Sequence, residues 1–233
     1  MGHAEEPTAS ASARVKREYQ GPEVTKFAFE TRFGWQMVNL AGQTDDNATG
    51  FRGEFINLSL NARIYKGLSI SWRQRFNRVP ESTFWDATDW LEMNYAFNGK
   101  WSVSAGKQVV AIGGYEYDRA PIDLYFCSEF WNNVACYQFG VSGAYSFNEG
   151  KDKLMFQFCQ SPFRTINPDM YAYNLMWYGN HGIFSSIYSV NMMEYAPGRF
   201  INYISLGNKF TFNRVSLELD FMNRATSHQT FFF

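Results

Sequence analysis

Basic side chains recur at alternate positions of the first extended segments of this chain. Aromatic and aliphatic residues fill the other positions of the same segments. The basic residues are Lys26, Arg32, Arg63, Arg73 and Arg75, and Glu30 is the acidic residue that shares their phase. Because arginine presents a fork of donors that suits phosphate and carboxylate groups, a wall with this excess of positive charge would favour anions. The alternative is that these charges only solvate a water-filled interior or pair with neighbouring carboxylates.

An acidic and aromatic stretch at 110–133 is the longest connector between extended segments. Its charged residues are Glu116, Asp118, Arg119, Asp123 and Glu129, four acidic and one basic. It also carries six aromatic residues, and long connectors of this kind are usually functional. One prediction is that the stretch folds inward, narrows a pore and faces the basic wall. The alternative is that it caps the rim or packs against a neighbouring subunit.

Cysteine and histidine form no recognisable catalytic or metal-binding motif. Cys127, Cys136 and Cys159 include no CxxC pair, and the three histidines show no HExxH spacing. His181 near Ser185 lacks the supporting motif that a hydrolase needs. We therefore expect no enzyme activity, no metal and no cofactor. Cys127 and Cys136 flank the end of the long connector and could pair in an oxidising compartment, but the sequence does not decide this.

The elements that would position these residues are β-strands, because apolar residues repeat with a period of two. Eleven strands are predicted, at 26–38, 56–63, 68–75, 91–97, 101–106, 137–145, 154–158, 171–177, 184–192, 200–210 and 215–224. Connectors alternate between short turns and long loops, with 195–199 as the exception in length. Short turns on one side and long loops on the other are typical of an all-β, antiparallel, up-and-down transmembrane barrel.

Composition excludes several classes of protein. Aromatic residues make up 19% of the chain, and charged residues make up 18%, below the roughly 25% of soluble domains. The net charge of −1 excludes a basic nucleic-acid binder and an acidic disordered chain. No segment is apolar enough for a transmembrane helix, but closed barrels also satisfy every backbone group in lipid.

The alternative architecture is a soluble or tethered β-barrel that binds an apolar ligand in its interior. Its aromatic phase would form the core, and its polar phase would face water. The polar phase here holds many small residues, Ser102, Ser104, Ser142 and Ala144 among them, whereas soluble exteriors are usually richer in Lys and Glu. Aromatic residues near strand ends, such as Trp90, suit girdles at the two lipid interfaces. The sequence therefore favours the membrane barrel.

Three features carry a resemblance to a known family: the alternating strands, the polar leader before them, and Gly106-Lys107-Gln108 followed by Gly113-Gly114-Tyr115. Over residues 24–224 the chain resembles the phosphate-selective porin O and P superfamily in its Bacteroidetes form. The resemblance implies a porin of the bacterial outer membrane that passes small hydrophilic solutes by diffusion. It further implies a mild preference for anions such as phosphate, contact with outer-membrane lipid, and a homotrimer of 16- to 18-stranded barrels.

Two regions are predicted: a polar leader at 1–23 and one transmembrane barrel domain at 24–233. The eleven or twelve strands in this sequence are fewer than the family's 16 to 18, and bacterial barrels close with an even number. Residues 227–230 are loop-like, and Phe231, Phe232 and Phe233 resemble the start of a twelfth strand. We therefore expect a barrel that is incomplete at its C-terminus. A twelve-stranded barrel with a vestigial last strand is the alternative.

Overall fold

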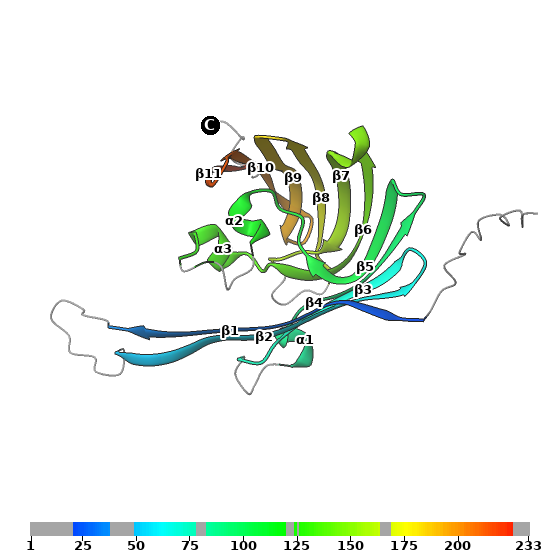
Figure 1. Cartoon of the computed structure of the whole chain (residues 1–233). Coiled ribbons are helices and arrows are strands. Elements are labelled where there is room, and N and C mark those ends of the chain that lie inside the picture. The colour runs from blue at the N-terminus through cyan, green and yellow to red at the C-terminus, as the bar shows by residue number, and fades with distance from the viewer. Residues whose placement is uncertain are drawn as a thin grey trace, which may run out of the picture.

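The computed structural model describes residues 21–37, 49–77, 83–119, 124, 126–163 and 169–225. Within these ranges, eleven antiparallel strands form a single sheet in the order of the chain (Figure 1). Each strand pairs with the strands before and after it, so the sheet is the predicted up-and-down meander. All eleven predicted strands are present.

The sheet consists of β1 (Glu23–Gln36), β2 (Gly50–Tyr65), β3 (Leu68–Arg75), β4 (Thr88–Phe97), β5 (Trp101–Val109), β6 (Tyr137–Phe147), β7 (Asp152–Gln160), β8 (Tyr171–His181), β9 (Phe184–Ala196), β10 (Arg199–Phe212) and β11 (Val215–Ala225). Between them lie α1 (Phe84–Ala87), α2 (Tyr115–Asp118), α3 (Glu129–Asn133) and the 3₁₀ turn η3 (Asn148–Gly150). No helix in the described part of the chain has the length and apolar character needed to cross a membrane. Strand β2 begins earlier than predicted because Gly50 and Phe51 pair with the end of β1.

The two phases of the strands lie on opposite faces of the sheet, with unusual exposures. Large apolar side chains on one face are open to the surroundings; Phe29 is 64% exposed and Phe156 is 52% exposed. Polar side chains on the other face, such as Asn57, Gln157 and Asn174, are buried. A soluble sheet buries its aromatic phase instead. This arrangement is that of a lipid-facing wall around a polar interior, and it argues against an interior that binds apolar ligands.

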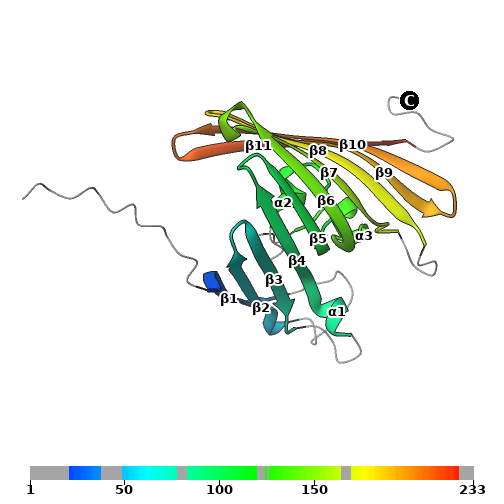
Figure 2. The same ribbon diagram turned by 90° about the vertical axis from the view of Figure 1, so that its right-hand side faces the viewer.

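The sheet curls, and α2 and α3 lie within its concave side (Figures 1 and 2). The concave side carries the buried polar phase, because the residues just before α2 bond to polar side chains of β7, β9 and β10. Strands β1 and β11 are the two edges of the sheet, and within the described residues they do not pair with each other. The site described next lies on the concave side, between these helices and the sheet.

Candidate functional site

Residues 110–136 leave the sheet after β5, cross its concave side and rejoin it at β6. We call them the inserted segment; residues 120–123 and 125 lie outside the described ranges. Its first turn docks on strands far along the chain. The Ala111 amide donates to Oε1 of Gln157 at 2.7 Å, and the Gly113 amide donates to Oγ of Ser189 at 2.8 Å. The start of the predicted long connector therefore lies against the concave side of the curled sheet.

A row of side-chain amides forms the surface on which this first turn rests. Gln157, Asn174 and Asn191 stand directly opposite one another on β7, β8 and β9. Asn174 Nδ2 donates to Gln157 Oε1 at 3.0 Å, and Asn191 Nδ2 donates to Asn174 Oδ1 at 2.8 Å. Asn191 Nδ2 also donates to the Ala111 carbonyl at 2.7 Å. The three side chains are fully buried, and such satisfied polar networks fix one arrangement of the groups they join.

Glycine makes the close approach of the inserted segment possible. A Cβ atom on Gly207 of β10 would lie 2.7 Å from the Cα of Gly114, and one on Gly113 would lie 2.8 Å from the Ile187 carbonyl oxygen. Gly114 also has a φ of +108°, which side chains rarely allow. The Gly113-Gly114 pair therefore marks the point where the inserted segment touches the sheet.

Apolar packing holds the remainder of the inserted segment. Residues of the segment and of β7 to β10 share one buried cluster: Val110, Ile112, Tyr117, Val134, Cys159, Ala172, Met193, Ile201 and Tyr203. Burial raises the pKa of Tyr117 well above its ordinary value, so its hydroxyl stays neutral. Cys127, Cys136 and Cys159 are all free thiols, so the structure contains no disulfide between Cys127 and Cys136.

The carboxylate of Asp220 on β11 holds the start of α2. It accepts the Tyr115 amide at 3.0 Å and the Glu116 amide at 2.9 Å. Free amides at the start of a helix are natural partners for a carboxylate. At the other end of α2, Arg119 forms an ion pair with Glu218 of the same strand.

The acidic residues predicted for this segment have different surroundings. Glu116 accepts the Ser128 amide at 2.6 Å and so ties the segment to itself. Glu129 is exposed at the start of α3 and accepts only from Asn133 among the described residues. Asp118 lines a cavity, described below, and Asp123 lies outside the described residues.

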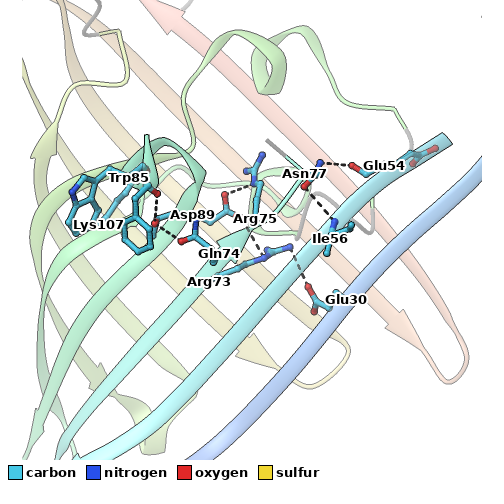
Figure 3. Close-up of polar contacts among 12 residues, drawn as sticks. Glu30, Glu54, Ile56, Arg73, Gln74, Arg75, Asn77, Trp85, Asp89 and Lys107 are labelled. Atoms are coloured by element: carbon cyan, nitrogen blue, oxygen red, sulfur yellow. Dashed lines mark hydrogen bonds and ion pairs between the residues drawn. The ribbon is translucent and has the colours of Figure 1, made fainter. Parts of the chain in front are cut away.

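Two of the predicted basic residues form a buried ion cluster (Figure 3). Arg75 Nε lies 2.6 Å from Asp89 Oδ1, and Arg73 Nε lies 3.4 Å from Asp89 Oδ2. Arg73 Nη2 also lies 3.4 Å from Glu30 Oε2. The side chains of Arg73 and Asp89 are only 3% and 2% exposed, so these positive charges are neutralised inside the protein.

The other three predicted basic residues lie apart from this cluster. Arg32 pairs with Glu54 and donates to the Leu124 carbonyl of the inserted segment at 3.0 Å. Arg63 pairs with Glu23 at 3.2 Å beside the short β2–β3 turn, and Lys26 lies opposite Asn61. Four of the five predicted basic residues are therefore paired with carboxylates.

Periodicity alone does not reveal the role of Asp89, because residue 89 falls in a predicted connector. It is instead the second residue of β4, where the β3–β4 register shifts between Arg73 and Gln74. Such a shift changes the direction of the side chains beside it, so Asp89 points inward although simple alternation would place it outward. Glu30 and Glu54 also pair with arginines, Glu30 with Arg73 and Glu54 with Arg32. These partners depend on how β1, β2 and β3 align in the sheet, which the sequence pattern does not specify.

A cavity of about 440 Å³ separates the inserted segment from β3 to β8. Its charged lining residues are Arg73, Glu92, Asp118, Arg119 and Lys153. Small residues from β5 and β6 form part of its wall: Ser102, Ser104, Ser142 and Ala144. These are among the small residues of the polar phase noted in the sequence, and their size leaves the space open.

Trp90 corrects one expectation about the aromatic girdles. It lines this cavity, and the guanidinium carbon of Arg73 lies 5.1 Å from the centre of its ring. Its indole nitrogen donates to Ser71 Oγ at 2.8 Å. Trp90 shares the inward phase of β4 with Glu92, so it cannot belong to a lipid-facing girdle.

A comparison with known protein families identifies the family of this chain. Residues 27–177, well over half of the chain, match the family described as phosphate-selective porin O and P. The chain belongs to this porin family. A search of curated proteins found no match. The inserted segment begins and ends within the part of this porin that matches the family, as does the ion cluster. Porins are a family of channels rather than of enzymes. Within the described residues there is no group of three or more metal-binding side chains.

Proposed function

We propose that this chain forms an outer-membrane porin through which small hydrophilic solutes diffuse passively, with the inserted segment as its constriction. The observation that supports this most is the docking of residues 110–119 on the polar, concave face of β7 to β11. A segment held inside a barrel narrows the aqueous path, and a porin selects by the size and field of that narrowed path. The apolar convex face supplies the surface for outer-membrane lipid.

Conductance across a planar lipid bilayer tests this proposal. The purified, folded protein should add discrete current steps in KCl, and the current should vary smoothly with voltage as in an open aqueous pore. Resistance of the folded protein to denaturing detergent at room temperature, lost on boiling, provides the check on folding. Folded protein that gives no conductance would rule out the proposed function.

A mild preference for anions such as phosphate is a second candidate property. The five basic residues on β1 to β3 favour it, as does the family description. The carboxylates beside Arg32, Arg63, Arg73 and Arg75 reduce the field that these residues exert on a solute. Reversal potentials in a KCl gradient measure the preference directly.

The Asp89→Asn substitution tests whether the arginines of the ion cluster select ions or only stabilise the structure. It removes the carboxylate shared by Arg73 and Arg75 while keeping its size. If these arginines govern ion selection, the reversal potential should shift towards the anion value. An unchanged reversal potential in folded protein would show that the cluster serves structure alone.

The oligomeric state is part of the same proposal. We expect a homotrimer, as the family resemblance implies, with the apolar convex face shared between neighbouring copies and lipid. Native mass measurement in detergent should give three times the mass of one chain, and a monomeric mass would exclude the trimer.

A further inference from the structure

Three charged side chains that line the cavity beside the inserted segment, two acidic and one basic, form no ion pair within the described residues. Glu92 of β4 lines this cavity, and its carboxylate has neither a hydrogen bond nor an ion pair within the described ranges. The carboxylate of Asp118 also accepts no hydrogen bond from any described residue. Its charge interacts through space with the ammonium group of Lys153, which lies 4.0 Å from the centre of the Tyr178 ring.

The remaining charges that line the cavity have partners. Arg73 is shared by Glu30 and Asp89, and Arg119 pairs with Glu218. A solute in the cavity therefore meets two carboxylates and one ammonium group as its available charges. These come from three elements, β4, α2 and β7.

We propose that this cavity binds small zwitterions of amino-acid size on their way through the pore, an inference that rests on the proposed diffusion function. The ammonium group of the solute would lie towards Glu92 and Asp118, and its carboxylate towards Lys153. A phosphate ion would face two carboxylates, and a simple amine would compete with Lys153 for the carboxylate of Asp118. Only a solute with both charges satisfies all three residues.

The size and polarity of the cavity fit this class of solute. Its volume of about 440 Å³ lies within the roughly 300–1,000 Å³ range of small-molecule sites. Hydroxyl groups of Ser102, Ser104 and Ser142 line it. Ser142 donates its proton to Gln108 and can accept from the ammonium end of a zwitterion, whereas Ser104 accepts from Asn94 and can donate to the carboxylate end. Trp131 and Tyr178 add aromatic surface for the apolar part between the two charges.

Interruption of the single-pore current by added solute tests the proposal. The probes are 4-aminobutyrate, butylamine, butyrate and inorganic phosphate, each added to folded protein that already conducts KCl. We expect 4-aminobutyrate to interrupt the current at a concentration about tenfold lower than butylamine or butyrate, because it makes one more charge-assisted contact than either. Equal effects of 4-aminobutyrate and butylamine, or a stronger effect of phosphate, would overturn the proposal.

Two variants identify the residues, and a third serves as control. Glu92→Gln and Lys153→Met should each raise the effective concentration of 4-aminobutyrate to that of the single-charge probes. Glu149→Gln, on the exposed η3 turn outside the cavity, should leave it unchanged. If the first two variants conduct KCl and respond to 4-aminobutyrate like the parent protein, the site is wrong although the porin function stands. If the folded parent protein conducts no KCl, the porin function itself fails.

Discussion

At the scale of single residues, Asp220 holds the inserted segment to the sheet most directly. Its carboxylate accepts two backbone amides of α2, and no other described side chain does so. Asp220→Ala should weaken docking by about 1 kcal/mol, since Asp220 is exposed and solvent screens part of the interaction. We expect more frequent switching to a wider state, seen as larger current steps. Asp220→Asn keeps one acceptor and should lie between the variant and the parent protein.

Asp118 should make ion selection depend on pH. Burial raises the pKa of its carboxyl, and the nearby Lys153 opposes that shift. A raised pKa means that Asp118 takes up a proton as pH falls sooner than an ordinary aspartate, whose pKa is about 3.9. The cavity then loses one negative charge, so selectivity should move towards anions. This change should occur at a higher pH than the titration of an ordinary aspartate would give. Reversal potentials measured from pH 7 downwards would show this movement.

The control for this prediction is Asp118→Asn, which removes the titrating group. The variant should give, at neutral pH, the reversal potential that the parent protein reaches only after acidification. Protonation also removes the cost of holding this charge within the protein, so the docking of α2 should be tighter at the lower pH. A parent protein whose selectivity does not change before pH 4 would contradict the assignment to Asp118.

At the scale of elements, the contact between β10 and the inserted segment depends on two glycines. Gly207→Ala places a Cβ atom 2.7 Å from the Cα of Gly114, and neither backbone can yield easily. Overpacking of this kind costs about 1–3 kcal/mol, so the inserted segment should detach from β10. Limited proteolysis should then cut the chain within residues 110–136. Gly143→Ala is the matched control, because nothing lies within 4 Å of its added Cβ and its strand should stay intact.

The elements were predictable because alternation of two residue classes is a local signal. It located all eleven strands and the long connector before β6, and it placed Ser102, Ser104 and Ser142 on the inward face. What the connector touches was not predictable. Its partners Gln157 and Ser189 are ordinary polar residues of distant strands, and only the register of the sheet brings them beneath Ala111 and Gly113.

The ion cluster shows the same limit at the level of single side chains. Arg73 and Arg75 were recognisable as inward and basic, but their neutralisation by Asp89 follows from a register shift that no periodicity reveals. We therefore expect ion pairs among these residues to weaken the predicted field between the basic wall and the acidic connector. Asp118 alone of the described acidic residues of the inserted segment lines the cavity.

At the scale of the whole molecule, the two faces of the sheet should respond oppositely to the same added charge. Phe156→Arg places a guanidinium on the exposed apolar face in the middle of β7. It should destabilise the protein in lipid by about 2–4 kcal/mol, the cost near the bilayer midplane. Urea unfolding in vesicles measures this loss.

Ser142→Arg is the paired change on the polar face, where it lines the cavity. It should leave the unfolding midpoint close to that of the parent protein, but it should lower conductance because a long side chain occupies the space. If both variants lost stability equally, the assignment of the two faces to lipid and water would be wrong.

The docking of the inserted segment also has a consequence for the order of events during folding. Its hydrogen bonds join residues that lie 46, 76 and 105 positions apart in the chain. Contacts over such separations form late, because the intervening chain must first be ordered. The segment leaves β5, yet it cannot settle until β7, β9 and finally β11 stand in register. The passage is thus wide while the protein is being made, and its narrowest point is the last part to take shape.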